Sequence, residues 1–282
     1  MHRSVPLLAL AVLTAGCAGS STATTAAPAS SAPTVAGSSA PSVAAPASPA
    51  TAARAIYYLH DDGQGPRLYR EFHPRPATTA VVRDAVTAML TVPAYDGDYT
   101  SLWPRSTRVL GARVSGTTAY VDLSHEATTG SAGGEGEAQS LQQLVHTVTA
   151  AAPSVQSVQL LIEGTAPATL WGHVDTRRPI ARGTAAEVLG PVWLTVPAAL
   201  KRGASFGGEA SVFEATVSWE FRQGTRVVKV GHTNASIGTP GRGSWSAVAD
   251  VPPGRYVLRA YESSAKDGTA THGDDKPVTV RA

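Results

Sequence analysis

The amino-acid sequence predicts an α+β two-layer domain, a mixed sheet with helices on one face, followed by an all-β immunoglobulin-like sandwich. A disordered N-terminal tether precedes both. Three observations carry this prediction. Residues 18–53 are almost entirely Ala, Ser, Thr and Pro, residues 54–183 alternate strand and helix patterns, and residues 187–282 keep only strand patterns between Gly, Pro and Asn turns. A chain of 282 residues has room for two such domains.

Residues 1–16 have the pattern of a signal peptide. Arg3 supplies positive charge, and residues 5–13 are mostly apolar but too few to span a bilayer, which takes about 20 helical residues. Small residues, Ala15 and Gly16, stand where a signal peptidase cuts. Cys17, the only cysteine of the chain, follows directly.

Residues 13–17 resemble the lipobox of bacterial lipoproteins, with Thr14 in place of the usual leucine. The resemblance implies cleavage between Gly16 and Cys17 and acylation of Cys17, for example with palmitate. Two or more acyl chains give stable anchoring, so the chain is expected on the extracytoplasmic face of the cell membrane, with the bilayer as its first partner. The alternative is an ordinary secretory signal followed by an incidental cysteine.

Residues 17–53 contain no charged side chain and only two branched aliphatic ones, so we expect a disordered tether that holds the domains away from the bilayer. Whether it is glycosylated stays open. The formal net charge of +2 leaves no basic excess, which disfavours nucleic acid as a partner. A single cysteine also allows no intramolecular disulfide.

In residues 54–183 we expect strands at 55–59 and 68–72, the second closing before Pro74. Thr78 or Thr79 should cap a helix with apolar residues at helical spacing over 81–90. A hairpin over 109–114 and 118–123, a helix over 137–151 and a strand over 155–162 follow. His146 lies off the apolar stripe of its helix and is predicted to be solvated or at an interface.

In residues 187–282 the strongest pattern is the alternation over 213–222, which predicts one face in a core and the other in water. Its apolar face comprises Phe213, Ala215, Val217, Trp219 and Phe221. Further strands are expected at 226–230, 245–251, 255–261 and 278–281. Tyr256 follows a Pro-Pro-Gly turn, the place of a tyrosine corner in a β-sandwich.

These segments resemble two known domains. Residues 56–182 are similar to the GerMN domain of sporulation and germination proteins, on the segments 57–59, 102–104, 119–124, 141–149 and 158–164. Residues 189–282 are similar to Gmad2, its immunoglobulin-like companion, on 208–217 and 261–268. Val196 departs from the serine expected near the start of Gmad2. The resemblance attaches no catalytic residues or cofactor to either domain, and whether sporulation is involved stays open.

Three short strings match catalytic or anion-binding patterns, and each lacks the required context. Ser205 lies in a G-x-S-x-G string, but no strand-to-helix turn is predicted there. Ser263 to Lys266 fit S-x-x-K but lead into an Asp-Gly turn. Residues 133–136 precede a helix, where Glu135 and Glu137 would repel an added anion and serve as acidic capping.

The histidine–acid strings 60–62 and 272–275 are predicted in separate turns, without the three convergent ligands of a catalytic zinc site, so no metal is expected. A candidate interaction loop remains near the end of the sandwich, in which Lys266 would reach Glu262 or Glu214. It comprises Glu214, Glu262, Ser263, Ser264, Lys266 and Asp267.

The leading hypothesis is a membrane-anchored, non-catalytic scaffold or protein-interaction module of the cell envelope, with an envelope protein as partner. The alternative is a receptor that binds a cell-wall fragment or small solute between its two domains. A serine hydrolase using Ser205 or Ser264 is a remote third hypothesis.

Overall fold

The computed structural model describes residues 51–282. The predictions for the signal peptide, for Cys17 and for most of the tether therefore lie outside the described residues. Among the described residues, no helix is both long enough and apolar enough to cross a membrane.

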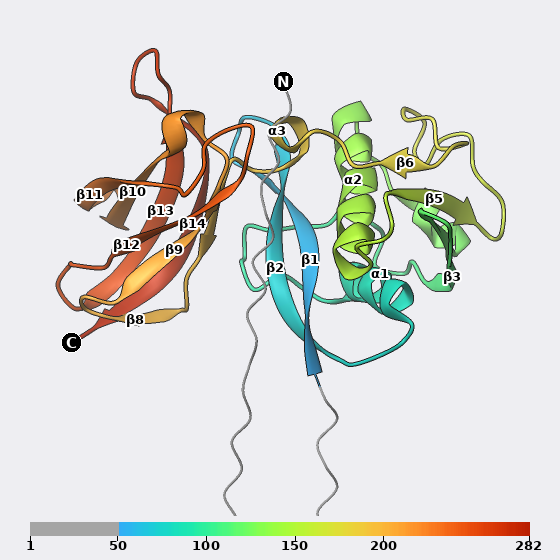
Figure 1. Ribbon diagram of the computed structural model, residues 1–282, viewed down its shortest axis with the longest axis horizontal. Helices are drawn as coiled ribbons and strands as arrows, with labels where there is room; N and C mark the ends of the chain where they lie inside the picture. Colours follow the sequence, from blue (N-terminus) through green and yellow to red (C-terminus); the bar gives the residue numbers. More distant parts are fainter. Residues whose placement is uncertain (1–50) are drawn as a thin grey trace, which may run out of the picture. The chain divides into compact units, whose positions relative to one another are not determined.

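The N-terminal domain begins with a long hairpin of β1 (Thr51–Asp61) and β2 (Pro66–Pro76), which form a two-stranded sheet of their own (Figure 1). Both strands are longer than predicted. β2 runs on through Pro74 and Pro76, because its outer edge has no neighbouring strand and an edge strand tolerates residues without an N–H donor.

A mixed four-stranded sheet follows, in the order β3 (Val109–Ser115), β4 (Thr118–Leu123), β5 (Ser157–Ile162) and β6 (Ile180–Ala181). The predicted hairpin of β3 and β4 is confirmed as antiparallel, and β4 pairs with β5 in parallel. This parallel pair is connected through the helix α2 (Gly134–Ala151), as parallel strands require a crossover. The mixed sheet of the predicted fold class is confirmed.

The helix α1 (Val81–Thr91) begins after Ala80 and has no side-chain cap. The predicted capping by Thr78 or Thr79 is wrong. The hydroxyl of Thr78 instead accepts the N–H of Ala80 at 3.1 Å, before the helix begins.

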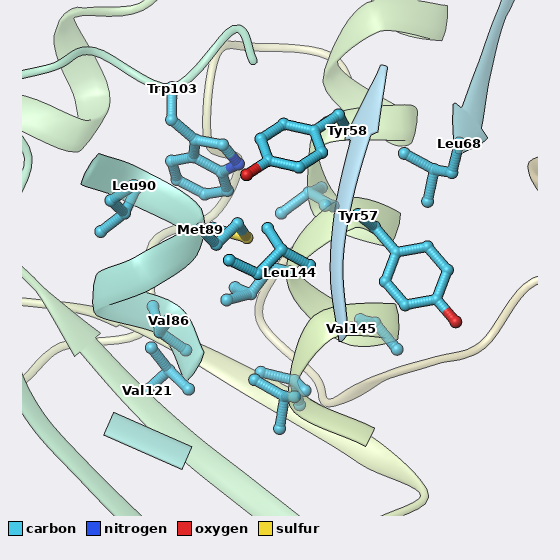
Figure 2. Packing of buried hydrophobic residues seen from close by; sticks show 14 of the residues in the cluster. Tyr57, Tyr58, Leu68, Val86, Met89, Leu90, Trp103, Val121, Leu144 and Val145 are labelled. Carbon is cyan, nitrogen blue, oxygen red and sulfur yellow. The ribbon is translucent and has the colours of Figure 1, made fainter. Parts of the chain in front are cut away.

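Helix α2 contacts the hairpin as well as β5, so it is buried nearly all round. Figure 2 shows Tyr57 and Tyr58 on opposite sides of β1, with α2 residues Leu144 and Val145 beside them. Polar side chains of α2 satisfy backbone groups of β1. The amide of Gln143 donates to the carbonyl of Tyr57 at 2.8 Å, and the Tyr57 N–H donates to Thr147 Oγ1 at 3.3 Å.

The same packing corrects the prediction of a solvated His146. Its side chain is only 2% exposed, and its ring lies 5.2 Å from that of Tyr57. Neither ring nitrogen has a hydrogen-bond partner. Burial is the larger cause that lowers the pKa of His146 to about 3, and the positive charge of Arg182 adds to it. The imidazole is therefore neutral at physiological pH.

The C-terminal domain is the predicted immunoglobulin-like sandwich. One sheet has the order β11-β10-β13-β14-β8 and the other β12-β9-β7. The bounds are β7 (Val192–Thr195), β8 (Ala199–Lys201), β9 (Ser205–Ala210), β10 (Thr216–Gln223), β11 (Arg226–Asn234), β12 (Gly243–Val248), β13 (Gly254–Ser263) and β14 (Ala270–Arg281). Between the two domains lies the short helix α3 (Ala185–Val188).

The sandwich core is built on aromatic contacts around Phe206, whose ring stands edge-on to those of Trp219, Phe221 and Trp245 at 5.4–6.1 Å. The predicted tyrosine corner is confirmed, because the Tyr256 hydroxyl donates to the carbonyl of Pro252 at 2.7 Å.

The prediction that Phe213 belongs to this core is wrong. The backbone adopts positive φ at Glu214 (52°) and Ala215 (57°), which breaks the strand alternation before β10. Phe213 is consequently 57% exposed, while Val217, Trp219 and Phe221 are buried as expected.

Candidate functional site at the domain junction

The predicted interaction loop of the sandwich is held mainly by hydrogen bonds within itself and to neighbouring strands. Glu262 accepts the N–H of Phe213 at 2.7 Å, and Ser263 bonds to Ser218 at 2.8 Å. Ser264 Oγ accepts the Lys266 N–H at 3.2 Å, and Asp267 accepts the N–H and the hydroxyl of Thr269. Within residues 51–282, Lys266 forms no ion pair, so the expected contact with Glu262 or Glu214 is not made.

The serines of the two catalytic strings lie in a strand and in a turn, not in the local structures that these catalytic motifs require. Ser205 begins strand β9, which continues to Ala210, so no helix begins directly after this serine. Ser264 lies in a turn closed by its own main chain, where the Gly268 N–H donates to the Ser264 carbonyl at 2.8 Å.

The prediction that Glu137 caps α2 is wrong. This residue is fully buried and accepts four backbone N–H groups at 2.8–3.2 Å, from Leu170, Trp171, His173 and Val174. Burial opposes its ionisation, but the four donors outweigh burial and lower the pKa of Glu137. The carboxylate thus organises the loop over 170–174 rather than its own helix.

The two histidine–acid strings were expected in separate turns, yet they meet where the two domains are in contact. Residues 272–275 lie within strand β14, which corrects that prediction. Asp62 joins the strings, since its carboxylate accepts the N–H of Gly273 at 3.0 Å and lies 3.0 Å from Nδ1 of His272. Across residues 51–282, no group of three or more His, Cys, Asp or Glu side chains has an arrangement suited to a metal ion.

A charged cluster is buried at this junction. Lys276 of β14 donates from Nζ to Asp96 of the N-terminal domain and, at 3.1 Å, to the hydroxyl of Tyr99. The same Nζ lies 3.4 Å from Asp274 Oδ1, and Asp274 Oδ2 accepts the N–H of Leu194 at 2.6 Å. Asp274 is only 1% exposed.

The protonation of this cluster follows from burial and charge. Burial raises the pKa of Asp274 to about 6, although Lys276 opposes the shift. Burial favours a neutral Lys276, but Asp274 and Asp96 outweigh it and raise the pKa of the ammonium. At neutral pH the cluster therefore holds a charged Lys276 beside an ionised Asp274.

Trp193 forms a second contact between the domains. Its indole N–H donates to the carbonyl of Leu68 at 3.1 Å, and two guanidinium groups lie over its ring, Arg70 at 4.8 Å and Arg242 at 4.0 Å. Burial lowers the pKa of Arg242 to about 10. Arg70 also forms an ion pair with Glu209 of β9. These contacts hold β2 against the sandwich, and residues 51–282 lie in a single compact unit.

A groove of about 350 Å³ opens between the two domains beside these contacts. The Asp96–Lys276 pair is among its lining residues, as are two exposed aromatic side chains, Phe72 at 52% and Tyr95 at 70%. The groove is lined by Arg70, Glu71, Phe72, Tyr95, Asp96, Gly97, Leu194, Thr195, Val196, Ala198, Lys276 and Pro277.

The sequence reasoning did not identify Asp96, Lys276 or Trp193 as site residues. Each belongs to a segment that reads locally as a loop or an ordinary strand. The available signal was the run of two acids and a lysine over 274–276, but the sequence pattern placed residues 272–275 in a turn, where charged side chains are ordinary.

Comparison with known families agrees with both domains. Residues 55–167 match the Germane family, described as sporulation and spore germination. Residues 192–269 match Gmad2, described as the immunoglobulin-like domain of bacterial spore germination. No curated protein is significantly similar to the chain.

Solved structures with related domains are distant. The first GerMN domain of the sporulation protein GerM from Bacillus subtilis is 21% identical over 46% of this chain and 95% of its own, with a TM-score of 0.37. The tandem GerMN domains of the same protein are 15% identical over 82% of this chain and 61% of theirs, with a TM-score of 0.40. A candidate lipoprotein from Clostridium perfringens is 20% identical over 46% of this chain and 87% of its own, with a TM-score of 0.34.

Likenesses of this size support no functional argument. The family matches, in the order expected for the two domains, together with the mixed α/β sheet and the sandwich, identify the fold. The chain belongs to the bacterial proteins that join a GerMN (Germane) domain to a Gmad2 domain.

Proposed function

We propose that this protein is an extracytoplasmic lipoprotein, anchored through Cys17, whose two domains act together as a non-catalytic interaction module of the cell envelope. The observation that carries the proposal is the buried contact between the domains. Because Lys276 of the sandwich is paired with Asp96 of the N-terminal domain across it, the two domains present one continuous surface to a partner.

Three further features support this role. The two matching families are described as sporulation and spore germination and as an immunoglobulin-like domain of bacterial spore germination. The serines of the catalytic strings lie in a strand and in a turn. Exposed apolar side chains on both domains, including Tyr95, Leu110 and Val230, offer contact area for a protein partner.

The anchor and the interaction are tested separately. Metabolic labelling with a palmitate analogue should mark the protein and lose the label in Cys17→Ala, which should also release the chain from the membrane fraction. Retention of the label in Cys17→Ala would contradict anchoring at this residue.

For the interaction, a photo-crosslinking residue is placed in turn at Tyr95, Leu110, Phe213 and Val230 in intact cells. We expect a discrete crosslinked envelope protein at one or more of these four positions. If none of the four positions yields a product above the unirradiated control, the interaction module is rejected.

The groove favours a second candidate function, that of a receptor for a cell-wall fragment or small solute. Its volume of about 350 Å³ and its aromatic wall fit a small ligand. A ligand that binds only the folded chain raises its melting temperature by mass action. Soluble muropeptides therefore provide a direct thermal-shift test, with Tyr95→Ala as the variant that should lose the shift.

A further inference from the structure

The register of the hairpin identifies which residues of β2 point their backbone N–H and C=O groups away from β1, at the outer edge. Leu59 of β1 exchanges both of its backbone hydrogen bonds with Thr100, on the side away from β2. Leu59 stands opposite Leu68, so this is a pair without hydrogen bonds inside the hairpin. Leu68, and by alternation Arg70 and Phe72, therefore point their N–H and C=O groups out of the free edge of β2.

Both ends of this edge are already closed. At one end the Leu68 carbonyl accepts the N–H of Gly190 at 3.0 Å, next to a parallel bridge between Leu68 and Leu189. At the other end Pro74 and Pro76 have no N–H to offer, a common protection of edge strands. The open part of the edge is thus limited to Arg70 and Phe72.

This open part lies in the groove between the domains. Arg70 and Phe72 line the groove, and within residues 51–282 their main-chain groups have no hydrogen-bond partner outside the hairpin. The segment that closes the edge at Leu68 leads directly into β7, the strand on the opposite wall. A peptide in the groove would therefore continue an established contact of the domain junction.

Each charged side chain that lines the groove already has a polar or oppositely charged partner. Arg70 is paired with Glu209 and Lys276 with Asp96. Glu71 accepts the N–H groups of Tyr95 and Asp96 at 2.8 and 2.9 Å, and its Oε2 lies 2.8 Å from Nε2 of His73. What remains to be satisfied is a strand edge between apolar walls, and a charged ligand would find no unpaired counter-charge.

We propose that this groove binds an extended, uncharged peptide segment of a protein partner by strand addition to β2 at Arg70 and Phe72. Main-chain hydrogen bonds to the edge give the affinity, and alternate apolar side chains of the peptide pack on Phe72, Tyr95 and Val196. The inference rests on the proposed interaction module and names its site and the chemistry of its partner.

The test uses the full chain and the blocked pentapeptide acetyl-Ala-Val-Thr-Val-Ala-amide. Because the chain has only four phenylalanines, labelling with ¹⁵N-phenylalanine gives four backbone signals, and Phe72→Leu assigns that of Phe72. On titration to about 5 mM we expect the Phe72 signal to move downfield and its hydrogen exchange to slow. The signals of Phe206, Phe213 and Phe221 should stay in place.

Two matched changes separate backbone pairing from simple apolar contact. Phe72→Pro removes the outward N–H at an edge position like that of Pro74, whereas Phe72→Leu keeps it. We expect the fluorescein-labelled peptide to bind roughly tenfold more weakly to Phe72→Pro than to Phe72→Leu, and an N-methylated peptide to lose affinity by a similar factor. Melting temperatures of both variants verify that each is folded.

Absence of any shift at Phe72, or equal affinities of the two variants and of the N-methylated peptide, overturns strand addition. A muropeptide that shifts Phe72 while the pentapeptide does not also overturns it, in favour of the receptor function. Crosslinking in cells is independent of these results. Partners captured around Leu110, Phe213 or Val230 with no peptide effect would reject the groove and leave the interaction module standing.

Discussion

The hydroxyl of Tyr69 donates a hydrogen bond to the carbonyl of Gly273 at 2.8 Å, across 204 residues of sequence. Tyr69 is 1% exposed, and burial together with Asp274 and Asp62 raises its pKa far above the ordinary value, so it remains a donor at all physiological pH. One bond thus ties the hairpin of the GerMN domain to the last strand of the Gmad2 domain.

Replacing Tyr69 by phenylalanine should lower the free energy of unfolding by about 1–3 kcal/mol, because it leaves a buried carbonyl without this donor. Urea unfolding of the full chain measures the change. Tyr95→Phe, at a tyrosine that is 70% exposed, is the control and should be neutral. Equal effects of the two variants would contradict the importance of the Tyr69 contact.

Replacing Lys276 by methionine should cost more, about 3–5 kcal/mol, because Asp96 and Asp274 would remain buried without their cation. The exposed Lys266, which has no ion pair within residues 51–282, supplies the matched control Lys266→Met. Thermal unfolding followed by tryptophan fluorescence compares them. A stability loss below that of Lys266→Met would show that the cluster is not a stabilising contact between the domains.

Replacing Glu137 by glutamine should destabilise the chain by about 2–4 kcal/mol, because the side-chain amide loses the charge and cannot accept from four N–H groups. Glu135→Gln, two residues earlier and largely exposed, changes the same charge on the same helix turn. We expect amide exchange of residues 170–174 to accelerate only in Glu137→Gln.

The lowered pKa of His146 predicts that the protein loses stability in acid. Its pKa of about 3 in the folded chain lies below its ordinary 6.5, so between these values the unfolded chain binds a proton that the folded chain does not. Lowering the pH from 7 to 5 should therefore cost about 2 kcal/mol through this residue. His146→Leu should remove that part of the pH dependence, measured by urea unfolding at both pH values, whereas the exposed His232→Gln should leave it unchanged.

Asp274 makes the free energy of unfolding depend on pH in the direction opposite to that of His146. Its pKa of about 6 in the folded chain lies above its ordinary 3.8, so between these values the folded chain holds the proton more tightly. Stability from this residue is present below pH 4 and is lost as the pH rises to 6. Asp274→Asn removes a contribution that opposes that of His146. The loss of stability as the pH falls from 6 to 4 should therefore be steeper in this variant than in the unchanged chain. An unchanged slope would contradict the raised pKa.

Local pattern was sufficient for much of the fold. The hairpin of β3 and β4 was readable from its turn, and the tyrosine corner from the Pro-Pro-Gly turn before Tyr256, because turn residues and alternation act over a few positions. Two errors arose because periodicity along the chain reports neither the local backbone angles nor what packs against a helix. Phe213 was assigned to the core by alternation that positive φ angles interrupt, and His146 was expected to be solvated because only one face of its helix is apolar.

By itself, the sequence determined the class of each domain and their order, because hydrophobic periodicity and turn chemistry are local properties of the chain. Only the tertiary structure decided that Asp96 and Lys276, 180 residues apart, form one buried pair, that the two histidine–acid strings meet, and that the open edge of β2 faces a groove. The physical reason is that docking of two domains depends on the shape and charge of completed surfaces. No periodicity along the chain encodes which of those surfaces will face each other.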